Sequence, residues 1–559
     1  MGTQVVVNGR SQKQPGVYSQ IKSGVINPLP ALSYGNVCII DTGATSAGVP
    51  TGDGWAIGSG INGTHKSGID SVLEFGSLNE FRDKIRGGYL WLLGQPLFLP
   101  MGSGKGIAGA SKVFYIKACT TVSAGVSFSL SGAISTPLVF KPLGEGTGAN
   151  GVVVSSNLTA GYGIKLVAGV VDVAKFKFQF YVTVFKGLDT QNGSIPFDGI
   201  TAAQSKPRLL VESPELTTVQ ALLDWCAVNS EFQKYFAIPA APTITGAGTI
   251  TGSHVTAYPG FTLATGGTEV YSSTDMDAVI TILNEVDNAI FLSTDTGANS
   301  MTLNNTKLLD FCSEVSKYEK FMFLGGGGST VTNQLKGLSG GNSQNIAAYF
   351  NSDNVIVCHG GIKKSFVGSV GLRTYNTLYK AFLCAGRTAG LEPQVPITLK
   401  PIDIDGEVHR LMTDDRDFCI DNGILYTYYD VELGKIVLGQ DINTLLNNAF
   451  LVNNDATSFS IQVKRITAQL NKEVIINAKK TFYGIESGPN RNTISQESIS
   501  SWLDGFLKSK VASTNDDDLI TDYGDIQVTV SEDNYSVQYS FVPNFEVSKI
   551  VFTGFILDK

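Results

Sequence analysis

Glycine-rich segments are the first residues in this chain that could do chemistry, because their backbone amides can bind phosphate groups. In Gly102–Gly106, Lys105 is followed by glycine, whereas a phosphate-binding loop of the Walker A type needs Ser or Thr there to hold magnesium. Gly325–Gly328 follows a predicted strand at Lys320–Leu324, but no helix with an acidic ribose partner follows at the distance that dinucleotide binding requires. Both segments are interpreted as connecting loops, and no cofactor is predicted.

Nucleophilic and metal chemistry are not expected either. The G-x-S-x-G pattern around Ser339 lies in a long glycine-rich stretch, whereas a hydrolase nucleophile needs a sharp turn between a strand and a helix. Asp414–Asp417 is interpreted as a solvated turn rather than an acid–base pair, and Asp516–Asp518 lacks the alternation and final Glu of a calcium loop. The histidines are too scattered for a zinc site; they are His65, His254, His359 and His409.

Composition and charge argue against nucleic acid as a direct partner. The chain has 559 residues, of which 62 are Gly and only 16% are charged, and its formal net charge is -8. Binding to phosphate backbones requires clustered Lys and Arg, and no long basic run occurs. A surface with few charges suits large interfaces between subunits, where charged residues are depleted. We therefore expect a multidomain protein whose partners are proteins.

Secretion, membrane contact and disulfide bonding are not expected from the sequence. Met1–Arg10 has no apolar signal segment, and no stretch approaches the roughly 18–20 consecutive apolar residues that span a bilayer. The seven cysteines are widely spaced and are expected to be reduced, buried thiols in a cytoplasm. Intersubunit disulfides formed after assembly remain the alternative.

Hydrophobic periodicity predicts an α/β (α+β multidomain) fold with mixed-sheet core domains. Strands alternate with helices between Ala289 and Gly390, which is typical of a mainly parallel sheet. Residues 113–204 hold short strands bounded by Gly and Asn, which predict an inserted small antiparallel β-barrel or sandwich. The stretch 239–267, rich in Thr, Gly and Ala, is interpreted as a surface insertion. Two amphipathic helices, Ile461–Ala478 and Gln496–Lys510, precede predicted paired strands at Asp525–Ser531 and Ser536–Val542.

The C-terminal run Val547–Leu557 is strongly β-forming and nearly uncharged. An apolar strand at a chain end cannot satisfy its own backbone groups, and it is a template for pairing with another chain. If it is donated to a neighbour's sheet, each added backbone hydrogen bond contributes roughly 0.5–1.5 kcal/mol. The alternative is that Val547–Leu557 closes the sheet of its own domain.

The order of the motifs resembles the contractile tail sheath family of bacteriophages, which is related to the sheaths of contractile injection systems. Gln14–Tyr18 is similar to the family's "PGVY" start, Ser77–Phe81 to its helix before a glycine, and Ala385–Gly390 to its "AG-x-x-A" helix. Glu145–Gly151 resembles the "GTWGN" turn but lacks its Trp. Further similar segments are Asn36–Gly43, Lys112–Lys117, Asp421–Ile424 and Gly439–Leu445.

The resemblance implies a structural subunit, not an enzyme, that forms stacked hexameric rings around a tail tube and contracts to drive the tube through the host envelope. It implies a location in the virion tail, assembly in the host bacterial cytoplasm, and other copies of itself, the tube protein, and baseplate and tail terminator proteins as partners. The implied parts are an extended arm (1–25), an outer α/β domain (26–112 with 205–392), an inserted β domain (113–204), an inner assembly domain (393–542) and a C-terminal strand arm (543–559).

Two sets of site residues follow from the resemblance. Lys508 and Lys510, on the predicted helix Gln496–Lys510, are expected to contact the tube, although the same helical pattern fits ordinary core packing. Strand exchange between subunits is expected at Val17, Tyr18, Val547, Ile550, Val551, Phe552, Phe555 and Ile556.

Two other classes of protein remain as alternatives. A static tube or capsid protein would also assemble, but it would not form two tubular polymers of different length and width. A secreted α/β hydrolase would need a placed nucleophile with its base, or a metal cluster, and the sequence presents neither.

Overall fold

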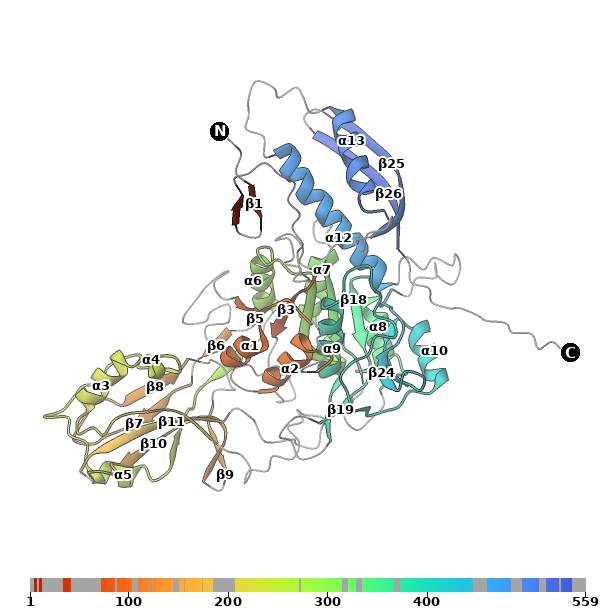
Figure 1. Ribbon diagram of the computed structural model, residues 1–559. Helices are drawn as coiled ribbons and strands as arrows, with labels where there is room; N and C mark the ends of the chain where they lie inside the picture. Colours follow the sequence, from red (N-terminus) through yellow and green to blue (C-terminus); the bar gives the residue numbers. More distant parts are fainter. Residues whose placement is uncertain are drawn as a thin grey trace.

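Figure 1 shows the computed structural model of the chain. A central sheet carries an inserted β-rich unit on one side, and the long helix α12 (Ile461–Ala478) leads away from the sheet to a helix and hairpin near the C-terminus. The structure describes residues 5–7, 10–12, 34–41, 72–85, 88–102, 109–118, 120–122, 124–143, 150–154, 156–172, 174–183, 207–270, 273–313, 320–327, 334–365, 372–445, 460–483, 495–511, 519–531 and 534–544.

The central sheet has seven strands in the order β22-β18-β17-β16-β3-β5-β4. All neighbouring strands are parallel except β4, which pairs antiparallel with β5. Most of these strands are apolar along their length because both sheet faces are covered, as parallel sheets require. They are β3 (Asn36–Asp41), β4 (Leu73–Phe75), β5 (Lys112–Lys117), β16 (Ile290–Thr296), β17 (Phe321–Gly325), β18 (Val355–Cys358) and β22 (Ile424–Leu425).

Alternate residues of β3 enter two separate cores, one on each face of the sheet. Val37 and Ile39 pack with α1 (Leu78–Lys84), α2 (Gly88–Phe98) and α9 (Thr377–Ala389). Cys38 and Ile40 pack on the other side with α6 (Ser273–Leu283), α7 (Leu303–Ser313) and α8 (Ser343–Phe350). Ser77 caps the start of α1, since the Glu80 backbone N–H donates to Ser77 Oγ over 3.3 Å. The predicted mixed α/β architecture is therefore confirmed.

The inserted unit consists of two antiparallel sheets that share one aromatic core. One sheet has the order β12-β11-β10-β14, with β9 also paired to β10, and the other has the order β13-β8-β7. The described residues form no closed barrel, so of the two predicted forms, barrel or sandwich, two packed sheets are found. The strands are β7 (Val126–Phe128), β8 (Leu138–Pro142), β9 (Val152–Val154), β10 (Asn157–Ala168), β11 (Phe176–Thr183), β12 (Arg208–Glu212), β13 (Phe236–Ala237) and β14 (Phe261–Leu263).

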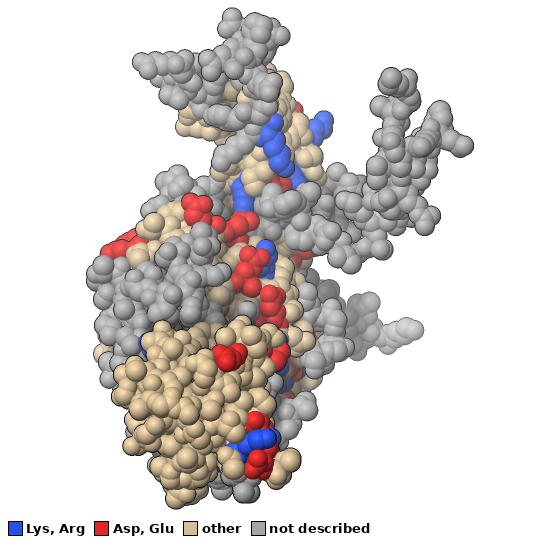
Figure 2. Space-filling view, turned by 90° about the vertical axis from the view of Figure 1, so that its left-hand side faces the viewer, with Lys and Arg blue, Asp and Glu red and all other residues tan. Residues whose placement is uncertain are grey.

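Residues on both sides of the predicted domain limit contribute to this core. The rings of Phe128 and Phe140 meet edge to face, and Phe140 also contacts Phe232. The predicted limits 113–204 stay a prediction, while the described core joins residues 124–182 with residues 216–264. The helices of the unit are α3 (Val219–Val228), α4 (Ser230–Gln233) and α5 (Gly252–Ala257), and Figure 2 shows that its outward face carries few charged side chains.

Short elements connect these bodies. The two chain segments that join the inserted unit to the sheet pair with each other as β6 (Thr120–Val122) and β15 (Thr268–Val270). The remaining elements are the hairpin β1 (Val5–Val7) and β2 (Arg10–Gln12), β19 (Ile362–Lys364), β20 (Arg373–Tyr375), β21 (Gly406–Glu407), α10 (Thr413–Asp421), β23 (Thr427–Asp430), β24 (Lys435–Leu438) and the 3-10 helix Gly297–Ser300. Within the described segments, no helix has the length and apolar character needed to cross a bilayer.

Candidate assembly surface

The helix α12 (Ile461–Ala478) joins the sheet to the C-terminal unit, which we define as α13 (Gln496–Lys508), β25 (Ile520–Ser531), β26 (Asn534–Pro543) and the half of α12 that they cover. At about 1.5 Å per residue, 18 helical residues span about 27 Å. The buried residues of α12 all lie between Ile461 and Leu470. Ile461 packs in the core of the body, whereas Ile466 and Leu470 pack in the core of the C-terminal unit, so α12 joins the two parts (Figure 1).

Arg465 fixes the first half of α12. Its guanidinium is almost fully buried and donates to the backbone carbonyls of Val395, at 3.1 Å, Glu392, at 3.0 Å, and Leu391. Burial lowers the pKa of Arg465 to about 10, and the nearby Asp441 carboxylate opposes that shift. The buried cation therefore holds the connector that follows α9, which we define as residues 391–405, against α12.

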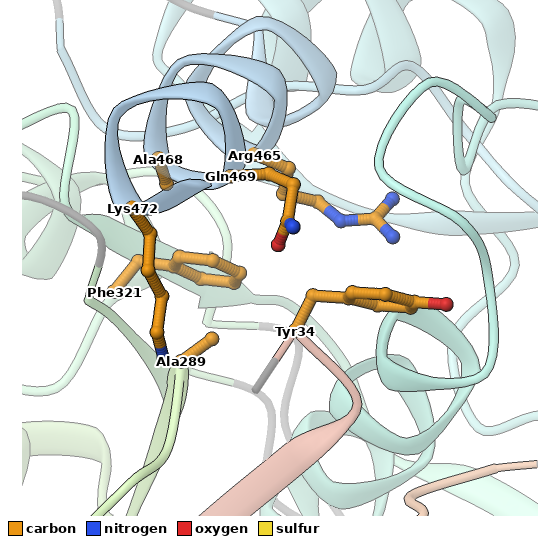
Figure 3. A pocket seen from close by; sticks show the side chains of 7 residues that line it. All are labelled: Tyr34, Ala289, Phe321, Arg465, Ala468, Gln469 and Lys472. Carbon is orange, nitrogen blue, oxygen red and sulfur yellow. The ribbon is translucent and has the colours of Figure 1, made fainter. Parts of the chain in front are cut away.

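A small pocket separates the middle of α12 from the amino ends of the central strands. Figure 3 shows Gln469 and Arg465 above the ring of Tyr34, with Lys472 descending beside Phe321. Lys472 Nζ lies 2.5 Å from Asp287 Oδ1, and Lys464 Nζ lies 2.8 Å from Asp353 Oδ2. These ion pairs join α12 to the loops that precede β16 and β18. The helix is therefore held against the amino ends of these strands.

The C-terminal unit has a small core of its own. Leu470 from α12, Leu503 and Leu507 from α13, and Leu519 and Ile520 from the start of β25 are buried together. The pair β25 and β26 forms a long antiparallel hairpin with register Ile520↔Pro543 at its open end and Ser531↔Asn534 at its turn. The helices cover one face of this hairpin, where Tyr539 and Phe541 pack, whereas Val542 on the other face is 44% exposed.

The edges of this hairpin are the candidate assembly surface. Among the described residues, the only further pairing is a single bridge between Val511 and Ile520. Along the rest of their outer edges, β25 and β26 present backbone N–H and C=O groups at the spacing with which an added strand would pair. An isolated two-stranded sheet is marginal in water, and additional strands stabilise it.

The predicted strand-exchange residues lie outside the described residues. They are Val17, Tyr18, Val547, Ile550, Val551, Phe552, Phe555 and Ile556. The predicted tube-contact lysines are described. Lys508 is exposed at the end of α13, while Lys510 Nζ lies 2.6 Å from Glu473 Oε2 and 5.7 Å from the centre of the Phe506 ring. Because Ile499, Leu503 and Leu507 are buried, α13 also has the core-packing role that the same pattern allowed.

The motifs that suggested chemistry are used for internal contacts. Ser339 is exposed in a turn, where its carbonyl accepts a hydrogen bond from Asn342 Nδ2 at 2.8 Å. In the loop after β17, the Gly327 N–H donates to Ser343 Oγ over 2.8 Å, and the Gly326 carbonyl accepts from Thr377 Oγ1 over 2.9 Å. The described part of this loop therefore binds its own neighbours. Of the residues 103–108, which include most of Gly102–Gly106, the structure describes none.

Sequence reasoning missed a buried polar cluster at the carboxyl ends of β17 and β18. Ser343 Oγ lies 2.8 Å from His359 Nδ1, and both residues are at most 1% exposed. Lys380 Nζ donates to the His359 carbonyl at 2.7 Å and to Thr427 Oγ1 at 2.8 Å, and lies 3.6 Å from Glu407 Oε1. These contacts join the start of α8, the end of β18 and the start of α9, so the cluster holds β18 against both helices. The only hint in the sequence is the place of the two residues: Ser343 begins α8, and His359 directly follows β18.

Cysteine burial follows the prediction for the described thiols. Cys38, Cys226, Cys312, Cys358, Cys384 and Cys419 are free and buried. Burial raises the pKa of Cys226 and Cys419 to about 12. The described segments contain no group of three or more His, Cys, Asp or Glu side chains placed to hold a metal ion.

Comparison with known proteins relates this arrangement to solved structures only. No family model matches the chain, and no curated protein matches it. A sheath tail protein from Desulfitobacterium hafniense is 12% identical, with a TM-score of 0.56 over 96% of this chain and 98% of that chain. A sheath tail protein from Listeria innocua is 14% identical, with a TM-score of 0.49 over 93% and 94%. The helical sheath protein of the anti-feeding prophage in its contracted state is 11% identical, with a TM-score of 0.35 over 52% and 78%.

The likeness to the Desulfitobacterium protein extends along nearly the whole of both chains. It shows that this chain has the fold of a sheath tail protein, and it confirms the resemblance found in the motifs at the level of the fold.

Proposed function

We propose that this chain is the structural subunit of a contractile tail sheath. Its copies stack as hexameric rings around a tail tube, and the polymer shortens to drive the tube through the envelope of a host cell. The subunit assembles in the host bacterial cytoplasm and ends in the virion tail. Its partners are other copies of itself, the tail tube protein, and the baseplate and tail terminator proteins. The work comes from a shift between two packings of folded subunits, without a chemical step.

The observation that carries this proposal is the full-length likeness of fold to a sheath tail protein. The alignment covers 96% of this chain and 98% of that chain, so it extends well beyond the central sheet. A likeness limited to the central parallel sheet would carry much less weight, because such sheets occur with many unrelated functions.

The hairpin edges support strand exchange as the means of assembly. In this proposal the segments containing Val17, Tyr18 and Val547–Ile556 leave their own subunit and pair with β25 or β26 of adjacent copies. A strand that makes about five backbone hydrogen bonds contributes several kcal/mol, at roughly 0.5–1.5 kcal/mol each. In this proposal, the exchanged strands link adjacent subunits and still allow each subunit to rotate.

The C-terminal end of α13 is proposed to face the tail tube. Lys508 is exposed there, and the ion pair of Lys510 with Glu473 holds this end of the helix against α12. A rigid, positively charged helix end suits contact with an acidic surface. This contact is the part of the proposal that fixes which side of the subunit points inward.

Negative-stain microscopy of purified subunits and of particles tests the proposal. A contractile sheath forms two tubular polymers that differ in length and width. A single tubular form under every condition contradicts contraction and favours a static tube or capsid protein.

Deletion of Val547–Lys559 tests the strand exchange itself. The matched control removes only Asp558 and Lys559, which leaves the strand-forming run intact. We expect the longer deletion to give folded subunits that fail to polymerise, and the control to polymerise normally. Normal tubes from the longer deletion would refute strand exchange, and loss of folding would show that Val547–Leu557 completes its own subunit.

A further inference from the structure

We propose that Gln462 anchors the root of the C-terminal segment to the body of the subunit, so that force on that segment does not peel β26 from β25. This inference rests on the proposed function, in which the segment after Asn544 connects neighbouring copies. It concerns a positioning residue: Gln462 fixes where the connecting segment leaves the subunit.

The side chain of Gln462 joins two backbone segments that are distant in the sequence. Its Nε2 donates to the Gln394 carbonyl at 2.7 Å and to the Asn544 carbonyl at 3.1 Å. Gln394 belongs to the connector after α9, and Asn544 is the residue after β26. The glutamine is only 2% exposed, so water competes poorly for these two bonds.

Gln462 is itself held in place. Its backbone N–H donates to Asp441 Oδ2 over 2.7 Å, and Ser460 Oγ donates to the same oxygen over 2.7 Å. One turn later, Arg465 binds three carbonyls of the same connector. The first turn of α12, the connector and the residue after β26 therefore form one hydrogen-bonded assembly.

The position of this anchor matters because of the hairpin's geometry. The open end of the hairpin, at the pair Ile520↔Pro543, is where a pull on the C-terminal segment arrives first. In a hairpin pulled from its open end, backbone bonds break one at a time instead of sharing the force. The Asn544 N–H donates to the Leu519 carbonyl over 3.1 Å, and Gln462 holds the carbonyl of the same residue. Both backbone groups of Asn544 are thus bonded before the first ladder pair is loaded.

Hydrogen exchange of the full-length subunit, followed by mass spectrometry, tests this inference. In Gln462→Met, which keeps the side-chain length but removes the amide donor, we expect exchange in the peptide covering 541–544 to become about 2- to 10-fold faster, the factor that one hydrogen bond provides. Gln469→Met is the matched control. Gln469 is also buried in α12, but its Nε2 donates to Glu473 Oε1 at 2.6 Å, so exchange at 541–544 should not change.

Two results would overturn the anchor. One is an equal change at 541–544 in both variants, or no change in either. The other needs no variant, and so holds even if Gln462→Met fails to fold: in the wild-type subunit, exchange at 541–544 faster than in the middle of β26 would show that the root is not held. All of these measurements use unassembled subunits, so a chain that never forms a contractile polymer would sink the proposed function and leave this result to stand separately.

Discussion

Lys510 Nζ lies 2.6 Å from Glu473 Oε2, so an ion pair joins the end of the α13 region to the second half of α12. The two side chains are 22% and 12% exposed, and water therefore screens this pair less than a pair on an open surface. The lysine that the sequence suggested as a contact for another protein has a partner within its own chain. The ion pair between Lys510 and Glu473 therefore fixes the orientation of α13 relative to α12.

The Lys510→Met variant should be less stable than the wild type by about 1–2 kcal/mol, because it leaves Glu473 partly buried without its cation. Lys508→Met is the control: that side chain is exposed at the helix end, so we expect a change within about 0.5 kcal/mol. Urea unfolding of both variants measures the difference. Equal losses would mean that the ion pair does not stabilise the unit.

The Arg465→Met variant should lose about 3 kcal/mol of unfolding free energy. Three buried carbonyls would lose a charged donor, and each unsatisfied group costs about 1–3 kcal/mol before the structure relaxes. The matched control is Lys464→Met on the same turn. The Lys464 partner Asp353 is 41% exposed, so the expected loss there is at most about 1 kcal/mol. A larger loss in Lys464→Met than in Arg465→Met would contradict the role given to the guanidinium.

His359 should make the protein less stable as the pH falls below about 6.5. Burial, with Lys380 nearby, lowers the pKa of His359 to about 3 from its ordinary value of 6.5. Between these values the unfolded chain binds a proton that the folded chain does not, so stability rises with pH across this window and falls with acidification. The loss between pH 8 and pH 5 is about 2 kcal/mol from this residue.

Urea unfolding at pH 8 and pH 5 of the wild type and of His359→Gln isolates that contribution, because the other titrating groups are common to both proteins. The wild type should lose about 2 kcal/mol more than the variant over this range. Identical losses in the two proteins would show that His359 takes up its proton in the folded state.

The elements that sequence periodicity predicted best are long or apolar throughout. The helix predicted at Ile461–Ala478 is α12 with the same bounds, and the predicted strand at Lys320–Leu324 is β17, moved by one residue. In each of these two elements, a single regular pattern of apolar residues determines the secondary structure. The hairpin was predicted too short at its start, because β25 begins among the polar residues Thr521 and Asp522 and has irregular register there.

The contacts of the candidate site depended on information that no local pattern holds. Glu473 and Lys510 belong to different helices, and Gln462 meets Asn544 only after the hairpin has returned to the body. The Ser343–His359 pair likewise requires β17, α8 and β18 to be placed side by side. Sequence patterns predict the elements, whereas such pairs follow from the tertiary arrangement.

The described cysteines should be unreactive in the folded protein at pH 8. All six are buried, and burial raises the pKa of Cys226 to about 12, which removes the reactive thiolate at that pH. An aromatic disulfide reagent should therefore modify at most one thiol per chain within minutes, namely Cys119, which lies outside the described residues. All seven thiols should react in denaturant. A second rapidly modified thiol would contradict the packing around one of the six.

Two helical glycines should respond to alanine in opposite directions. At Gly386 in α9, a Cβ atom would lie 2.5 Å from the Pro96 carbonyl oxygen and 2.6 Å from that of Leu97, because α9 crosses the backbone of α2 there. Backbone cannot move as a flexible side chain does, so Gly386→Ala should destabilise the protein by about 1–3 kcal/mol. At Gly505 in α13 no atom lies within 4 Å of the added carbon.

Gly505→Ala should therefore stabilise the protein by about 0.5–1 kcal/mol, because alanine loses less backbone entropy than glycine when a helix forms. Thermal unfolding of the two variants checks both signs against one wild type. The prediction for Gly386 also explains the "AG-x-x-A" pattern in α9, since only glycine permits this distance between the two helices. A neutral Gly386→Ala variant would mean that α2 and α9 lie farther apart than the structure places them.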